Sequence, residues 1–160
     1  MRCDMKRKVV WISLLLLILW GPTLASAEWR QLETKYHQNA YGTKYFYETN
    51  LSYAAASSPK TPIVVLWGKI VYNGKSDPAY AQLLSNGCPP EMTAVELKYL
   101  IDINNKKAAI VYGVLYDTQG RTLGTDEKPN APYSPIPPDT GAEVVWRMVK
   151  ELHEKGAISK

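Results

Sequence analysis

Histidine and cysteine, which are common metal ligands and supply reactive bases and nucleophiles near neutral pH, are rare in this 160-residue chain, with two of each. His37 and His153 are far apart in the sequence, and Cys88 is followed directly by two prolines. A zinc site needs three or four converging ligands, and a catalytic thiolate needs a neighbouring base. The sequence therefore predicts no metal site and no cofactor. One catalytic possibility stays open, that folding brings a histidine next to Cys88 and makes its thiol a nucleophile.

Acid–base chemistry has one candidate pair, the adjacent carboxylates of Asp126 and Glu127. They lie in the stretch 124–138, which contains five prolines and is typical of a surface loop with solvated side chains. Neither a Gly-x-Ser-x-Gly elbow nor a glycine-rich phosphate loop occurs in the chain. We therefore expect a protein that is not an enzyme.

Aromatic side chains are the best candidates for binding. Tyr45 and Tyr47 flank Phe46 on one predicted strand, so the two tyrosines point to one side of the strand and Phe46 points to the other. Aromatic residues in strands usually pack in the core or pair across strands, whereas an exposed aromatic patch is typical of contact with a protein or a glycan. Both interpretations stay open at this point. The candidates are Tyr45, Tyr47, Trp67, Tyr112, Tyr116 and Trp146.

The first 27 residues have the order of segments found in a secretory signal peptide. A basic start precedes the apolar run 9–20, and small residues at Ala25 and Ala27 follow a Gly-Pro break. The apolar run has 12 residues, whereas a membrane-spanning helix needs about 20. We therefore expect cleavage between Ala27 and Glu28, with an uncleaved anchor as the alternative.

Cleavage would leave one globular domain, residues 28–156, and a short flexible tail at 157–160. Residues 28–160 carry 15 basic and 14 acidic side chains. Because the net charge is so small, the sequence predicts no nucleic-acid partner, and membrane contact only through the signal peptide during export. Cys88 would be its one cysteine, either a free thiol or a bridge between two molecules.

Six segments have the alternation or the aromatic content of β-strands. Residues 63–72 are apolar on both faces, so we expect a central strand covered on both sides. Gly68 within it marks a bulge or the close approach of another backbone. Residues 93–103 lead into 108–116 through a tight turn at two asparagines, which tolerate the positive φ of hairpin turns. The remaining strands are expected at 28–33, 43–48 and 121–123.

Two helices have clear end signals. Asp77 and Pro78 predict the N-cap and first residue of a helix over 77–85. Thr140 and Glu143 form a capping box, in which the hydroxyl accepts from the Glu143 amide and the carboxylate reaches back to the cap. Apolar residues then recur at helical spacing as far as Leu152. Strands in series before an amphipathic helix predict an α+β fold, an antiparallel sheet of about five or six strands flanked by a C-terminal helix.

In the order of its features the chain resembles the surface-adhesin protein E family of Gram-negative bacteria. The resemblance covers nearly all of residues 29–152. The features that carry it are Trp29 at the start, the aromatic strand Tyr45-Phe46-Tyr47, the strand Val65-Leu66-Trp67-Gly68-Lys69, the turn Tyr116-Asp117-Thr118-Gln119-Gly120, and the proline stretch and helix that close the domain.

This resemblance implies a sheet with a C-terminal helix, export to the periplasm or outer surface of a Gram-negative bacterium, and, for the founding adhesin, attachment to host extracellular proteins. The cysteine pair of many members is missing, since Asp102 stands near its first position. We therefore expect a non-enzymatic binding domain with a protein partner among host or envelope proteins, and a homodimer stays open. The alternative is a periplasmic small-ligand carrier or accessory subunit of an envelope complex, with a pocket between sheet and helix near Trp67 and Trp146.

Overall fold

The computed structural model describes residues 28–36, 41–74 and 76–159. Three predictions fall outside them: the signal segment, its cleavage residues Ala25 and Ala27, and the placement of His37. Glu28, the expected first residue of the mature domain, is described and exposed, and its carbonyl accepts a hydrogen bond from the Thr49 amide at 3.0 Å.

Eight strands form one antiparallel sheet in the described part of the chain. Six of them follow the order β1-β2-β4-β5-β6-β7, while β3 pairs with β4 and β8 pairs with β6. The sheet is therefore a meander, β4 to β7, extended by an N-terminal hairpin. The strands are β1 (Trp29–Gln31), β2 (Lys44–Glu48), β3 (Ser52–Tyr53), β4 (Ile63–Val71), β5 (Met92–Asp102), β6 (Lys107–Asp117), β7 (Thr122–Glu127) and β8 (Ser134–Pro135).

Two α-helices and the short 3-10 helix η1 (Thr34–Tyr36) complete the fold. The helix α1 (Pro78–Ser85) begins at the predicted cap, where Asp77 accepts a hydrogen bond from the Ala79 amide at 2.8 Å. The helix α2 (Gly141–Glu154) buries an apolar stripe against the sheet. The predicted α+β fold, an antiparallel sheet with the C-terminal helix packed on it, is therefore confirmed.

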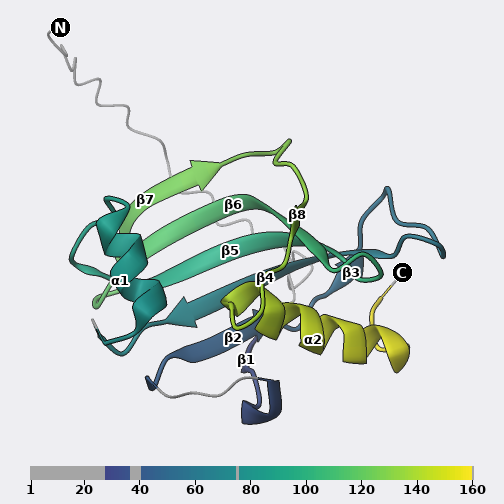
Figure 1. Cartoon of the computed structure of the whole chain (residues 1–160), viewed down its shortest axis with the longest axis horizontal. Coiled ribbons are helices and arrows are strands. Elements are labelled where there is room, and N and C mark those ends of the chain that lie inside the picture. The colour runs from purple at the N-terminus through teal and green to yellow at the C-terminus, as the bar shows by residue number, and fades with distance from the viewer. Residues whose placement is uncertain (1–27, 37–40, 75, 160) are drawn as a thin grey trace, which may run out of the picture.

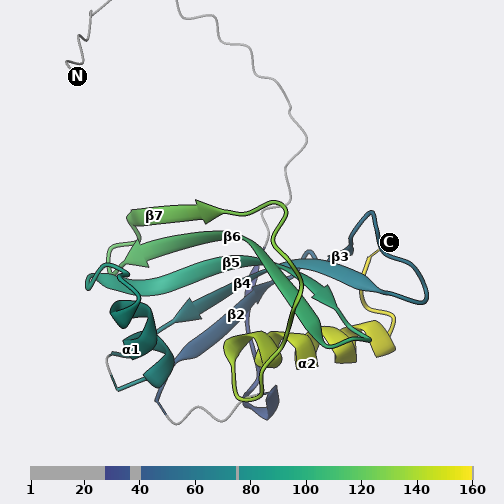
Figure 2. The same cartoon turned by 45° about the horizontal axis from the view of Figure 1, so that its top comes forward.

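Both α-helices lie on the same face of the sheet (Figures 1 and 2), which we call the inner face. Alternation along β4 separates the two faces, because Leu66 and Ile70 are buried on the inner face whereas Trp67 and Lys69 point the other way and stay half-buried. We call that second face the outer face. Among the described residues, no helix covers it.

The core of the molecule consists of two clusters on the inner face. The larger one packs α2 against β4 and β5, and the smaller one packs α1 against β5. Burial of this apolar area is the main source of stability, because the described residues hold no disulfide. The most deeply buried large side chains are Val64, Leu66, Met92, Tyr99, Ile101, Met148 and Val149.

The strand at 63–72 differs from its prediction in two ways. The expected cover on both sides is wrong, since both helices lie on the inner face. Pairing with β2 and β5 is regular at Gly68, so there is no bulge. A Cβ at Gly68 would lie 3.0 Å from Cε2 of Tyr99. The close approach is therefore made by an aromatic ring of the neighbouring strand and not by a backbone.

The hairpin between β5 and β6 also differs in detail. The positive φ of 48° falls on Lys106 and not on either asparagine. The Asp102 carboxylate accepts hydrogen bonds from the backbone N and the Nδ2 of Asn105, at 3.1 and 2.9 Å, and so holds the turn together. The expected loop at 124–138 is wrong in two places. At its start, β7 continues to Glu127 by pairing its backbone with β6, and further on the short strand β8 also pairs with β6.

Candidate functional site

Aromatic and charged side chains from four strands meet on the outer face. Trp67 and Tyr112 contact edge to face, with ring centroids 5.5 Å apart and an angle of 73° between the rings. The Nζ of Lys98 lies 5.9 Å from the centroid of the Trp67 ring. We call the whole set the outer aromatic cluster, and it consists of Trp29, Trp67, Lys69, Glu96, Lys98, Tyr112 and Tyr116.

Lys69 organises the second half of this cluster. Its Nζ lies 5.7 Å from the Trp29 ring, 5.4 Å from the Tyr116 ring and 2.9 Å from a carboxylate oxygen of Glu96. The Tyr116 hydroxyl donates to the other oxygen of Glu96 at 3.1 Å. Each cation–π contact contributes about 0.5–1 kcal/mol at an exposed site, so the rings are held in fixed orientations before any partner arrives.

The outer aromatic cluster is partly withdrawn from water and carries charges of both signs. Glu96 exposes 16% of its side chain, so its ion pair with Lys69 is only partly screened. Burial raises the pKa of Glu48 on the adjacent strand, and the Glu96 carboxylate raises it further, whereas Lys98 lowers it. Burial also raises the pKa of Tyr116, and its hydrogen bond to Glu96 acts in the same direction. Lys69 and Lys98 thus face Glu96 and the neighbouring Glu48, and Glu127 adds a third carboxylate at the hollow beside Trp67.

The outer face is hollowed beside Trp67. A cavity of about 360 Å³ is lined by Trp67, Lys98, Tyr112 and Glu127 among others. Its shape depends on a β-bulge, since Lys98 pairs with Tyr112 and the next pair skips Val111, which also lines the cavity. Hollows of this kind accept the anchor side chains of a partner at protein interfaces.

The structure brings together three of the six predicted aromatic candidates, Trp67, Tyr112 and Tyr116. Tyr45 and Tyr47 point to the inner face instead and pack against the larger core cluster. Trp146 packs against the same cluster from α2. The predicted pocket shared by Trp67 and Trp146 is therefore wrong, because the two rings lie on opposite faces of the sheet.

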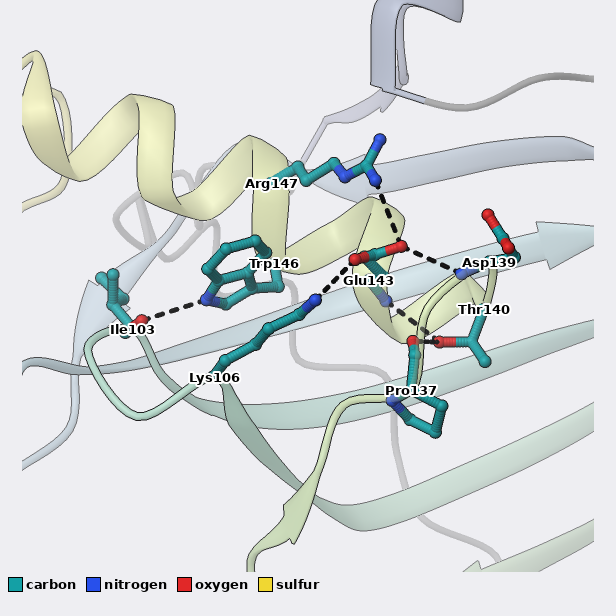
Figure 3. A network of polar contacts seen from close by, with 8 residues as sticks. All are labelled: Ile103, Lys106, Pro137, Asp139, Thr140, Glu143, Trp146 and Arg147. Atoms are coloured by element: carbon teal, nitrogen blue, oxygen red, sulfur yellow. Dashed lines mark hydrogen bonds and ion pairs between the residues drawn. The ribbon is translucent and has the colours of Figure 1, made fainter.

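Trp146 belongs to a network of polar contacts at the start of α2 (Figure 3). Its Nε1 donates to the carbonyl of Ile103 at 3.1 Å, and the Nζ of Lys106 lies 5.0 Å from its ring. The same Nζ is 2.6 Å from the buried carboxylate of Glu143, which Arg147 approaches to 3.3 Å from the next helical turn. The network fastens the β5–β6 hairpin to α2, and its role is structural.

The capping box is correct at Thr140 and wrong in the reach of the glutamate. The Glu143 amide donates to Oγ1 of Thr140 at 3.3 Å, as expected. The Glu143 carboxylate, however, accepts from the amide of Asp139 at 2.9 Å, one residue before the cap. Asp139 can present its amide there because its φ is positive, 58°. The hydrogen bond from Lys106 and then that from Asp139 hold the pKa of Glu143 below its usual value.

The nucleophile and base candidates lie in separate parts of the fold. Cys88 is a free, partly buried thiol that packs beside the smaller cluster under α1. His153, on α2, has its Nδ1 2.7 Å from the hydroxyl of Tyr53. Tyr53 and His153 line a cavity of about 420 Å³ together with Ser57, whose hydroxyl accepts a hydrogen bond from the Ile63 amide at 3.0 Å. The Cys88–His153 pair that the sequence left open is not formed.

The adjacent carboxylates of Asp126 and Glu127 do not act as a pair. Successive side chains of a strand point to opposite faces, and Glu127 lines the outer hollow. Asp126 forms an ion pair with Lys128 at 2.7 Å and lines a different cavity on the inner face. The two groups therefore cannot converge on one substrate.

Sequence analysis missed four members of the outer aromatic cluster, Trp29, Lys69, Glu96 and Lys98. The signal for the two lysines is alternation, since Lys69 shares the side of Trp67 and Lys98 stands on the polar side of its strand. Bringing them together needs the register, which pairs Trp67 with Lys98 and Lys69 with Glu96. Strand register is not readable from one sequence when both faces are apolar.

Two further findings concern the described residues alone. They contain no group of three histidine, cysteine, aspartate or glutamate side chains placed to hold a metal ion. None of their helices has the length and apolar character needed to cross a membrane.

No protein-family model, curated protein or solved structure matches this chain. Its function must therefore be inferred from its own surface, since a sheet-and-helix fold is compatible with many activities.

Proposed function

We propose that this protein is an exported, non-enzymatic binding domain, and that the outer face of its sheet holds a protein partner. The observation that carries the proposal is the outer aromatic cluster, in which rings, lysines and a glutamate form one surface free of any described helix. Tryptophan and tyrosine dominate the energetics of protein interfaces when they surround or fill a desolvated pocket.

The arrangement of the rings favours binding in a second way. Trp67 is held between Tyr112 and Lys98, and Tyr116 is held by Lys69 and Glu96. Ordering flexible side chains costs about 0.5–1.5 kcal/mol for each one immobilised at an interface. Because these side chains are already ordered by their neighbours, little of that cost remains to be met when the partner binds.

The charge balance of this surface indicates the class of partner. Lys69 and Lys98 are offset by Glu48 and Glu96, whereas nucleic acids and anionic lipids bind surfaces with a clear excess of positive charge. A protein with an apolar protrusion and charges of both signs suits the outer face best. The resemblance to surface-adhesin protein E points in the same direction, to host extracellular proteins or to proteins of the bacterial envelope.

The proposal is tested by binding measurements on the protein produced from the full-length chain. Panels of purified host extracellular-matrix proteins and of proteins from the bacterial envelope are presented on biosensor surfaces. We expect Trp67→Ala to weaken binding to the partner by about thirtyfold, which corresponds to about 2 kcal/mol. The reason is that the substitution removes a side chain that lines the hollow, and with it the edge-to-face contact that orients the Tyr112 ring.

The matched control is Tyr41→Ala, which removes an aromatic ring that is 46% exposed and lies outside the outer aromatic cluster. This control should bind within about twofold of the parent protein, since surface substitutions away from special contacts change little. Near-UV circular dichroism reports whether each variant keeps its fold. Equal losses in both folded variants, or no binding partner in either panel, would contradict the proposal.

A further inference from the structure

We infer that a cavity on the inner face, beside α1, binds the alkyl chain of a single-chain amphiphile whose head group is neutral or zwitterionic. The cavity lies on the inner face, and most of its lining comes from α1, β5, β6 and β7. Tyr112 of β6, a member of the outer aromatic cluster, also lines it and is the residue that this cavity shares with the outer hollow. The inference stands independently of the function proposed for the outer face.

The cavity has the size and the lining of a binding site for a small apolar molecule. Its volume is about 470 Å³, and pockets that hold small ligands measure about 300–1,000 Å³. Apolar side chains come from both the helix and the sheet, so a chain inside would be enclosed from two sides. The walls are formed mainly by Tyr72, Leu83, Leu97, Ile110 and Leu115.

One glycine keeps the sheet side of the cavity open. Gly113 on β6 and Gly124 on β7 both line the cavity, but a Cβ at Gly113 would lie 3.2 Å from Cδ2 of Leu97, so the space beside Gly113 is already occupied. A Cβ at Gly124 would meet no atom within 4 Å, so the space above this residue is empty of protein. Glycine weakens a strand, because its backbone loses more conformational entropy on folding than that of other residues and because it offers no side chain for packing. The absence of a side chain at Gly124 therefore leaves free a part of the cavity that a larger residue would fill.

The walls leave apolar surface in contact with water. Ile110 is 44% exposed, although it lies inside β6 and pairs with Tyr99 of β5. Leu83, Leu97 and Leu115 are each partly exposed around the same cavity. A ligand that covers these side chains gains the full hydrophobic benefit of removing them from water. An alkyl chain does so without leaving any polar group unpaired.

An ion pair beside the cavity indicates the head group. Asp126 and Lys128 both line the cavity, lie 2.7 Å apart and expose about two thirds of their side chains, 68% and 65%. Adjacent opposite charges complement a zwitterion or a hydroxyl-rich head, which can both donate and accept. A carboxylate head would meet the negative charge of Asp126 as well as the positive charge of Lys128.

The test uses dodecylphosphocholine below its micellar concentration, with the protein produced from the full-length chain. Methyl signals of Leu83, Leu97 and Ile110 are followed by nuclear magnetic resonance as the amphiphile is added. We expect saturable shifts of these signals, and weaker binding of dodecanoate, which has the anionic head. In Gly124→Leu the new side chain occupies the cavity, and each methylene kept out lowers affinity by about fourfold, so at least a tenfold loss is expected.

The control is Thr122→Leu, which adds an equally large apolar side chain to an exposed position of the same strand, outside the cavity. It should bind as the parent does. Ile110→Asn supplies a second variant at an exposed position and should also bind more weakly. Trp67→Ala should leave this affinity unchanged, which separates the site from the outer face. No saturable shifts in the parent protein, or equal affinity in Gly124→Leu and Thr122→Leu, would overturn the inference.

Discussion

Replacing Met148 with alanine should lower the free energy of unfolding by about 2–5 kcal/mol. Met148 is 2% exposed and lies in the larger core cluster, where α2 meets β4 and β5. Alanine forms helices at least as well as methionine, so the loss would report packing between helix and sheet and not the stability of the helix itself. Urea unfolding followed by circular dichroism measures this difference.

The control for this prediction is Glu154→Ala on the same helix. Glu154 is exposed, and its ion pair with Lys150 is long, 3.9 Å. Its removal should change stability by no more than about 0.5 kcal/mol. If Met148→Ala were as mild as Glu154→Ala, α2 would not be packed on the sheet in solution.

The second large effect is expected at the start of α2. Glu143→Ala should cost about 1.5–3 kcal/mol, because it removes the acceptor of hydrogen bonds from Lys106 and from the Asp139 amide. Combined with Lys106→Met in a double-mutant cycle, it should show coupling of at least about 0.5 kcal/mol. Additive losses from the two substitutions would contradict the contact between hairpin and helix seen in Figure 3.

The same network should make stability depend on pH in a defined direction. The pKa of Glu143 is lowered from its usual 4.5, first by the hydrogen bond from Lys106. A carboxyl group whose pKa is depressed by folding stabilises the protein fully above its unfolded pKa, and the stabilisation disappears as pH falls through the folded value. The stability difference between the parent and Glu143→Gln should therefore be largest near neutral pH and shrink below about pH 4.5. A difference that stayed constant into the acid range would contradict this assignment.

Much of the fold follows from local patterns. Alternation over 93–103, with Leu100 as the exception, locates β5, and the Asp77-Pro78 pair and Thr140 mark the starts of both α-helices. These signals are short-range, because a cap or an alternating face needs only a few neighbouring residues. The details that failed depend on partners distant in the sequence. The ring of Tyr99 explains Gly68, and pairing with β6 extends β7 to Glu127.

The candidate site was predictable only in part for the same physical reason. Alternation alone shows that Tyr112 and Tyr116 lie on one side of their strand, and that Tyr45 and Tyr47 lie on one side of theirs. It does not show which face receives the helices, because residues 63–72 are apolar on both sides. Register and helix placement decide the matter, and they put Trp67 with Lys98 on the outer face while Trp146 packs within the inner layer.

Photo-crosslinking in living cells tests most directly whether the outer face is the binding surface. A photoreactive amino acid is placed at Glu127, an exposed residue that lines the outer hollow, and separately at Ala81, an exposed residue of α1 on the inner face. We predict a discrete crosslinked protein species from position 127 that is lost when Trp67→Ala is added, and none from position 81. Crosslinks from position 81 alone, or a species at position 127 that persists without Trp67, would show that partners are held elsewhere.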